Sequence, residues 1–117
     1  MAQLTNERCA ACRRDSPRVT EAEIAQLHRG VAEWALVEDN GIPRLMRTFL
    51  FDDFAGALAF TDAVGAIAED EGHHPRLATQ WGRVTVTWST YIIQSLHRND
   101  FIMAAKTDQV YARLVAG

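Results

Sequence analysis

Two adjacent histidines, His73 and His74, are the residues of this sequence best suited to chemistry near neutral pH. Imidazole is the side chain whose ordinary pKa lies nearest neutrality, so a pair of histidines suits proton transfer. Gly72 and Pro75 flank the pair and predict a turn, which follows the acidic run 69–71 at the end of a predicted helix. Carboxylates there oppose the helix dipole, and a broken local rule often marks a functional site. A solvated surface turn has the same pattern, so the surrounding residues must decide between a functional site and a simple turn.

The two cysteines, Cys9 and Cys12, form a CxxC motif without the neighbours that a metal or redox site needs. The next histidine, His28, lies inside a predicted helix, and no strand precedes the motif as in thioredoxin-like proteins. We interpret residues 1–19 as a poorly ordered segment with reduced cysteines, and an intermittent disulfide or an adventitious metal ion remain alternatives. Adjacent histidines seldom bind one ion, so we also expect no metal at the histidine pair.

Length and composition limit the classes of function. The 117 residues suffice for one hydrophobic core, and residues 20–117 are predicted to form a single domain. A net charge of -3 favours neither nucleic acid nor an anionic membrane as a partner. No apolar run is long enough to span a membrane, and the first residues lack the apolar core of a signal peptide. We therefore expect a soluble, cytoplasmic protein.

Hydrophobic periodicity predicts three helices and four strands that position the histidines. The expected elements are a helix from a Thr20 capping box, strands at 34–37 and 45–51, a helix capped by Asp52 or Asp53 and ending near 71, strands at 77–81 and 84–91, and a helix capped by Asn99 or Asp100. This order predicts an α+β fold with a four-stranded antiparallel sheet and three helices on one face. The uncovered face and edges of such a sheet favour a homo-oligomer.

The spacing of the residues around the histidines resembles the signature of the pterin-4a-carbinolamine dehydratases. The residues that carry the resemblance are Glu69, His73, His74, Pro75, Trp81, Tyr91 and Asp100. The stretch 96–108 (LHRNDFIMAAKTD) resembles the bacterial branch of that family, and the likeness extends over roughly residues 20–115. The family's order of helices and strands also agrees with the order predicted above.

The resemblance implies a specific reaction, the removal of water from 4a-hydroxytetrahydropterin to give quinonoid dihydropterin. It implies a pterin substrate, no metal or other cofactor, a homodimer or homotetramer, and a functional link to an aromatic amino acid hydroxylase whose pterin cofactor is recycled. The reaction requires a proton for the leaving oxygen and the removal of another from a ring nitrogen. A histidine can do either near pH 7.

The resemblance also implies which residues form the site. The catalytic candidates are His73, His74 and Glu69; the candidates for binding the pterin are Gly72, Pro75, Trp81, Ser89, Thr90, Tyr91 and Ile92. We favour His74 as the acid on the 4a-hydroxyl and His73 as the group that positions the pterin, and the reverse assignment stays open. Glu69 would orient the pair, and Trp81 is equally well explained by core packing. Asp100 is better explained as a helix cap.

One residue departs from the family's pattern. Tyr91 stands where typical members carry a third histidine or a tryptophan, and a phenol is a poor base because it is protonated at pH 7. His97 is a conceivable substitute, but we interpret it as a structural or surface residue. The departure leaves a second hypothesis open: a catalytically weak or inactive paralogue that acts as a binding or assembly module. Dehydratase-like proteins include transcription-factor dimerisation cofactors and carboxysomal Rubisco assembly factors.

Overall fold

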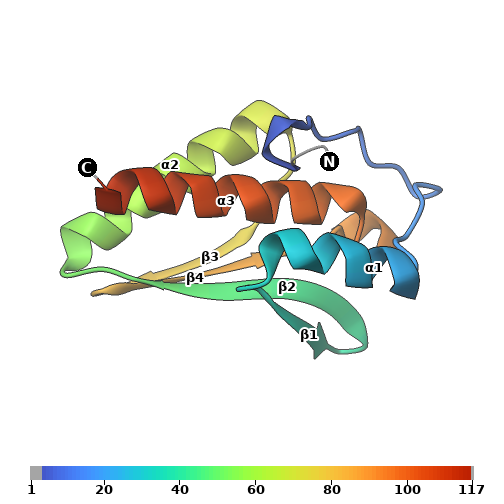
Figure 1. The fold of residues 1–117 in the computed structure, drawn as a ribbon, viewed down its shortest axis with the longest axis horizontal. Coiled ribbons are helices and arrows are strands. Elements are labelled where there is room, and N and C mark those ends of the chain that lie inside the picture. Colours follow the sequence, from blue (N-terminus) through green and yellow to red (C-terminus); the bar gives the residue numbers. More distant parts are fainter. Residues whose placement is uncertain (1–3, 117) are drawn as a thin grey trace.

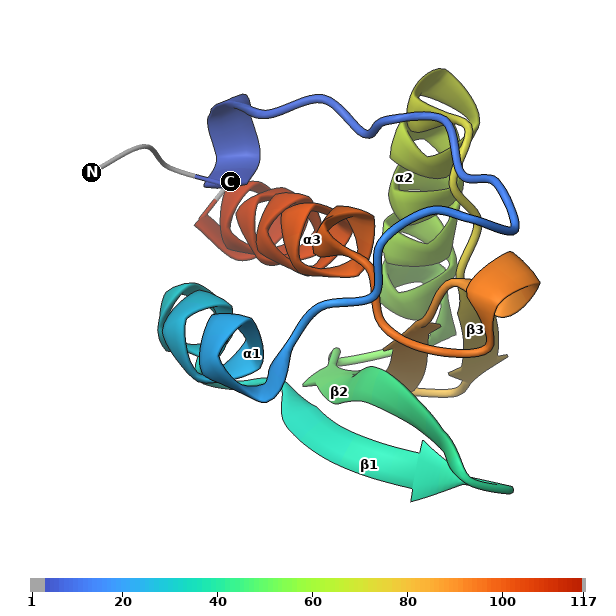
Figure 2. The same cartoon turned by 90° about the vertical axis from the view of Figure 1, so that its right-hand side faces the viewer.

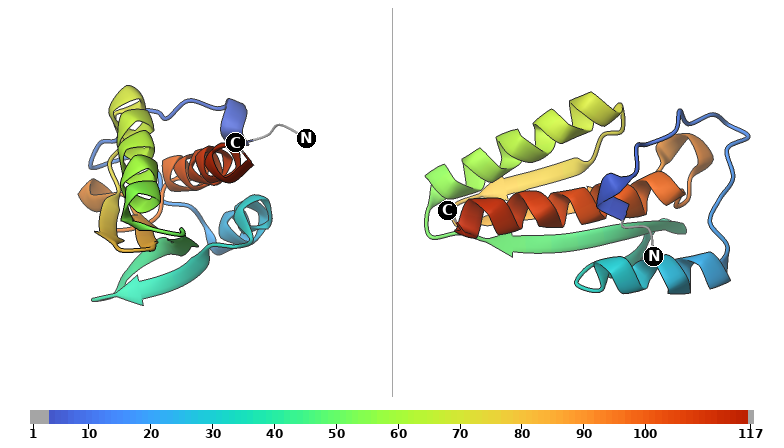
Figure 3. Two further views of the ribbon diagram at one scale, coloured as in Figure 1. Left: turned by 90° about the vertical axis from the view of Figure 1, so that its left-hand side faces the viewer. Right: turned by 45° about the horizontal axis from the view of Figure 1, so that its top comes forward.

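A four-stranded antiparallel sheet, in the order β1-β2-β4-β3, has α1, α2 and α3 on one face (Figure 1, Figure 3). The computed structural model describes residues 4–116. In chain order the helices and strands are α1 Glu21–His28, β1 Ala35–Asp39, β2 Ile42–Leu50, α2 Phe54–Glu71, β3 Arg76–Gln80, β4 Arg83–Trp88 and α3 Arg98–Ala116. The short 3-10 helices are η1 Leu4–Asn6, η2 Arg29–Val31 and η3 Tyr91–Ile93. The predicted α+β class and the predicted order of elements are confirmed.

Short-range signals in the sequence set the ends of these elements. The Thr20 hydroxyl accepts from the Glu23 N–H, and the Glu23 carboxylate accepts from the Thr20 N–H, which is the predicted capping box. Asn40 and Gly41 take positive φ angles of 53° and 77° and close the β1–β2 hairpin. Asp53 caps the start of α2 by accepting a backbone hydrogen bond. These local rules explain why the order of elements could be predicted.

Two strand boundaries differ by three residues from those predicted, and the others by one or two. β2 begins at Ile42, earlier than residue 45, because the tight hairpin pairs Pro43 with Glu38 of the edge strand β1. β4 ends at Trp88 and does not reach residue 91. The Thr90 N–H bonds to the carbonyl of Ser95, so the chain closes a loop around η3 instead of continuing the sheet.

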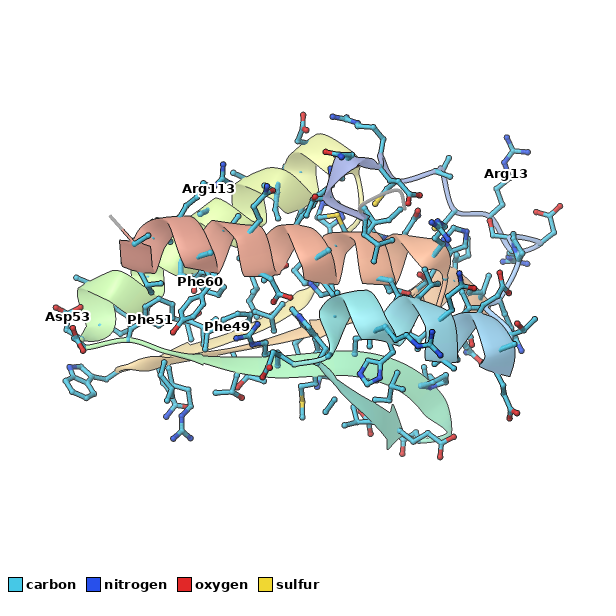
Figure 4. All side chains as sticks on the ribbon, viewed as in Figure 1. Arg13, Phe49, Phe51, Asp53, Phe60 and Arg113 are labelled. Atoms are coloured by element: carbon cyan, nitrogen blue, oxygen red, sulfur yellow. The ribbon has the colours of Figure 1, made fainter. Side chains whose placement is uncertain are left out.

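The core lies between the sheet and the helices. Phe49 of β2 contacts Phe60 of α2 and Tyr111 of α3, with ring centroids 4.7 and 4.9 Å apart. Figure 4 shows the labelled Phe49, Phe51 and Phe60 in the layer between the sheet and these two helices. Burying each such ring stabilises the fold by roughly 1.5–3 kcal/mol. The packing holds α2 and α3 against the sheet, so that the end of α2 and the start of α3 lie close to the end of β4.

No helix of residues 4–116 lies over the opposite face of the sheet (Figure 1). It carries exposed apolar side chains of β2, Met46 and Leu50, which alternate with the buried Leu45 and Phe49. A homo-oligomer that covers this face stays a prediction. Within residues 4–116 no helix is both long and apolar enough to cross a membrane.

Residues 4–19, which we name the N-terminal strap, lie along the domain across the end of α2 and the start of α3 (Figure 2). The sequence led us to expect a poorly ordered segment, and residues 1–3 of it lie outside the described residues. The side chain of Asn99 donates to the Ala10 carbonyl (2.8 Å) and accepts from the Ala10 N–H (3.0 Å), as a neighbouring strand would. Arg98 binds Glu7 through two hydrogen bonds of 2.7 and 2.8 Å. Polar contacts therefore fix the strap.

Glu71, the last residue of α2, is the second attachment point of the strap. Its carboxylate is 3 % exposed, accepts from the Cys9 N–H at 2.8 Å and lies 3.1 Å from the Lys106 ammonium. Burial alone raises the pKa of Glu71, but the Cys9 N–H and Lys106 outweigh burial and hold this pKa below its ordinary value of 4.5. The stabilisation is therefore present above pH 4.5 and is lost as pH falls through the lowered folded-state pKa.

We predict that Glu71→Gln lowers the free energy of unfolding by about 1 kcal/mol at pH 7, because the neutral amide no longer pairs with Lys106. The loss of stability that the wild type shows as the pH falls below 4.5 should become less steep in the variant. Urea unfolding at a series of pH values measures both effects. Glu38→Gln, which alters an exposed carboxylate on β1, is the matched control and should keep the wild-type profile. Parallel profiles for wild type and Glu71→Gln would contradict the prediction.

Candidate active site

His73 is held in a fixed orientation directly after α2. Gly72 ends the helix in the left-handed conformation, with a φ of 66°, and turns the chain back toward the sheet. The His73 ring stacks on the buried Trp88 at the end of β4, with centroids 5.7 Å apart and planes at 10°. Its Nε2 lies 2.7 Å from Oδ1 of Asp100, and the side chain is 10 % exposed. An ionised carboxylate there makes Nε2 the protonated nitrogen and leaves Nδ1 as the other proton site.

Asp100 has no exposed surface and accepts hydrogen bonds on both carboxylate oxygens. Oδ1 faces His73, while Oδ2 accepts from the Thr90 hydroxyl at 2.7 Å and from the His97 N–H at 2.9 Å. A buried carboxylate is tolerated only with such a set of donors. Asp100 therefore connects the turn after α2, the loop after β4 and the start of α3.

The cap of α3 is His97 rather than the predicted Asn99 or Asp100. The helix begins at Arg98, and the Nδ1 of His97 accepts from the Asn99 N–H at 3.0 Å, while Asp100 reaches back to the His97 N–H. The pattern is that of a capping box with histidine in the place of serine or threonine. Burial lowers the pKa of His97 and outweighs the nearby Asp100, which raises it. A lowered pKa suits Nδ1, which must stay unprotonated to accept the hydrogen bond from Asn99. His97 is buried and structural.

His74 points to the other side of the chain and is exposed. Its Nε2 lies 2.9 Å from Oε1 of Glu69, and the two side chains are 60 % and 81 % exposed. The two adjacent histidines therefore have separate carboxylate partners, a buried one for His73 and a solvated one for His74. Glu69 contacts only one member of the pair that it was expected to orient.

The candidate binding residues fall into two groups in the structure. Gly72 and Pro75 flank the histidines, and Ser89, Thr90, Tyr91 and Ile92 lie in the loop after β4, whose Thr90 is bonded to Asp100. Tyr91 and Ile92 are 80 % and 47 % exposed on η3. Ser89 accepts from Arg44 at 2.9 Å.

Trp81 lies apart from both groups within one chain. It follows β3, which starts directly after Pro75, so the length of the strand separates Trp81 from Pro75 by about 20 Å. Its side chain is 70 % exposed, so it does not pack in the core either. Among residues 4–116 no three His, Cys, Asp or Glu side chains converge in a way that could hold a metal ion.

The role of Asp100 in the site was missed by reasoning from the sequence, which explained it as a helix cap. The signal that could have found it was present, because Asp100 is one of the spaced residues that carry the resemblance stated above. The contact of Asp100 with His73 could not be predicted from the sequence.

Comparison with known proteins decides the family. The family model described as pterin 4 alpha carbinolamine dehydratase matches residues 17–110, which include both histidines and Asp100. The chain belongs to this family. A relative from Gloeobacter violaceus, provisionally named pterin-4-alpha-carbinolamine dehydratase 1, is 57 % identical over 97 % of this chain and 97 % of its own length. A provisionally named pterin-4-alpha-carbinolamine dehydratase from Nitrosococcus oceani is 52 % identical over 94 % of this chain and 97 % of its own.

Solved structures of two similar proteins carry different descriptions. A transcriptional coactivator/pterin dehydratase from Brucella melitensis aligns with a TM-score of 0.74 and 30 % identity, over 81 % of this chain and 99 % of that protein. A pterin dehydratase-like protein, described as a RuBisCO assembly factor in the alpha-carboxysome, aligns with a TM-score of 0.58 and 25 % identity, over 68 % and 89 %. The fold of the pterin-4a-carbinolamine dehydratase family therefore occurs in proteins with different roles, and the function of this member must be argued from its site.

We predict that Asp100→Ala lowers the free energy of unfolding by at least about 3 kcal/mol, because three buried donors lose their acceptor. Thr90→Val removes one of these donors and keeps the carboxylate, so it should cost only about 1 kcal/mol. Urea unfolding of the two variants beside the wild type measures the difference. A loss in Asp100→Ala no larger than in Thr90→Val would contradict the central place that we assign to this carboxylate.

Proposed function

We propose that this protein dehydrates 4a-hydroxytetrahydropterin to quinonoid dihydropterin. The observation that carries the proposal is the contact between His73 and Asp100, a histidine held by a buried carboxylate beside a second, solvated histidine. Dehydration breaks the C4a–O bond, with one proton delivered to the leaving oxygen and one removed from a ring nitrogen. Two histidines with separate partners suit these two transfers. Membership of the family supports the same substrate class.

The geometry favours His73 as the group that protonates the 4a-hydroxyl, which reverses the assignment that the sequence favoured. Asp100 fixes the ring and stabilises the positive charge that the imidazole takes up, as an aspartate does for the histidine of a serine protease. Stacking on Trp88 removes the remaining rotational freedom, so little reorientation is needed before transfer. Nδ1 is the nitrogen left to exchange the proton.

His74 is proposed to bind the pterin and to accept the proton of the ring nitrogen. Its exposed ring exchanges protons readily with solvent, and Glu69 balances the charge when the ring is protonated. The chemistry consists of proton transfers, so we propose that it needs neither a metal ion nor an organic cofactor. We propose further a cytoplasmic homodimer or homotetramer that acts after an aromatic amino acid hydroxylase, the enzyme that forms the 4a-hydroxypterin.

A dehydration assay on chemically generated 4a-hydroxytetrahydropterin tests the proposal. We predict that the wild type exceeds the buffer rate and that His73→Ala lowers kcat by roughly 10²–10⁴-fold, the usual contribution of a positioned acid. His74→Ala should raise KM more than it lowers kcat. The control is His28→Gln, on α1 outside the site, which should retain the wild-type kinetics.

Two outcomes of this assay would count against the proposal. A wild-type rate equal to that of buffer would remove the enzymatic function altogether. A larger loss of kcat in His74→Ala than in His73→Ala would return the acid to His74 and leave His73 as the positioning group.

The exposed Tyr91 on η3 leads to a separate prediction. A phenol donates a hydrogen bond but does not accept a proton near neutral pH, so an imidazole at this position adds a proton carrier beside the histidine pair. We predict that Tyr91→His raises kcat by about tenfold or more, within the range expected for an added acid or base. Tyr91→Phe is the control and should leave kcat near the wild-type value. An unchanged or lower kcat in Tyr91→His would show that the tyrosine does not limit the reaction.

The second candidate function is that of a binding or assembly module without strong catalysis. Tyr91 favours it, as does the similarity to a protein described as a RuBisCO assembly factor. Size-exclusion chromatography of the purified protein with Rubisco, compared with each component alone, tests this alternative. Co-elution together with a dehydration rate equal to buffer would support the module over the enzyme.

A further inference from the structure

An open groove is lined by two segments that are far apart in the sequence. Arg14 and Arg18 of the N-terminal strap form one wall, and residues 91–94 of the loop after β4 form the other. Figure 2 shows the strap passing close to η3 at this end of the molecule. Neither wall is a binding site by itself, so no pattern in the sequence predicts the groove.

The two arginines of the groove differ from two paired arginines at this end of the molecule. Arg8 and Arg98 are paired with Asp70 and Glu7. Arg14 and Arg18 are exposed, and within residues 4–116 neither forms an ion pair or a side-chain hydrogen bond, so their guanidinium groups are available to a ligand. The chain as a whole carries a net charge of -3, so this positive charge is local.

The second wall adds a flat aromatic side chain and an amide. Tyr91 is 80 % exposed and Ile92 47 % exposed, so both offer apolar surface to a ligand. Gln94 takes the left-handed conformation, with a φ of 49°, and is an exposed member of the groove. Two guanidinium groups opposite aromatic and apolar surface suit an organic ligand with an anionic group, above all a phosphate, which arginine binds through paired hydrogen bonds.

The groove is connected to the proposed reaction centre by a single residue. Thr90, which precedes Tyr91, donates to the Asp100 carboxylate that holds His73. The inference requires a pterin ring at the histidines to direct its variable substituent, at C6, toward the groove. A negatively charged C6 side chain would neutralise Arg14 and Arg18.

We propose that this groove binds a phosphorylated C6 side chain, so that the substrate of this protein is an anionic reduced pterin. This inference rests on the proposed function. Arg14 and Arg18 are then residues that determine substrate specificity, with no part in proton transfer. Asp15, between them in the sequence, does not line the groove.

Equilibrium binding tests the inference without requiring turnover. The probes are neopterin and neopterin 3′-phosphate, which share the ring and differ in the phosphate, titrated by fluorescence at low salt. The wild type should bind the phosphate ester about tenfold more tightly, as expected for two partly solvated arginine–phosphate contacts. The double variant Arg14→Gln/Arg18→Gln should bind the two probes equally. Arg13→Gln is the matched control, since Arg13 is on the same strap, outside the groove, with its side chain pointing away from the domain (Figure 4).

Three results would overturn the inference. The first is equal binding of the two probes by the wild type. The second is a double variant that still binds the phosphate ester more tightly than neopterin. The third is binding of inorganic phosphate as tight as that of the phosphate ester, which would make the groove a site for free phosphate and not for a pterin side chain.

Kinetics separate this inference from the proposed function. With the 4a-carbinolamines of tetrahydroneopterin and of its 3′-phosphate, the double variant should raise KM for the phosphorylated substrate alone, at unchanged kcat. A wild type that binds the phosphate ester preferentially but dehydrates neither substrate contradicts the proposed function and leaves the groove assigned. A wild type that dehydrates both with equal KM supports the enzyme and overturns the preference.

Discussion

The buried carboxylate of Asp100 is the interaction on which this end of the molecule depends. Desolvating a carboxylate costs several kcal/mol unless donors surround it, and Asp100 receives the His73 ring, the Thr90 hydroxyl and the His97 N–H. The donors come from the turn after α2, the loop after β4 and the start of α3. The Asp100 carboxylate therefore holds three segments of the fold together and orients the ring of His73, the candidate catalytic residue. Function and stability at this site cannot be varied independently.

The order of elements could be predicted because its signals are local. The Thr20 capping box and the Asn40-Gly41 turn each act within four residues. The contact of Asp100 with His73 spans 27 positions, and no periodicity records such a distance. The resemblance marked Asp100 as relevant but did not say what it touches. The distance of Trp81 from the histidines could have been foreseen, since a strand separates them.

The contacts of the strap could not be read from composition, and the poor order of residues 1–19 stays a prediction. A polar segment with few apolar residues is expected to lack order because it buries little surface. Here backbone groups of the strap bond to side chains of the domain, Asn99 and Glu71, and periodicity does not reveal such partners. Burial raises the pKa of Cys9 to about 12 and also raises that of Cys12, so both are neutral thiols and weak nucleophiles. With both thiols neutral, the CxxC motif contributes to the packing of the strap.

The adjacency of the two histidines has a geometric consequence. His73 and His74 have different carboxylate partners and different exposures, so the two adjacent rings lie in different environments. One ring is fixed by a buried carboxylate, and the other stays in contact with solvent. Such a division suits the two different proton transfers proposed for this site. Tyr91 lines the groove together with Arg14 and Arg18, which agrees with the binding role that we propose for it.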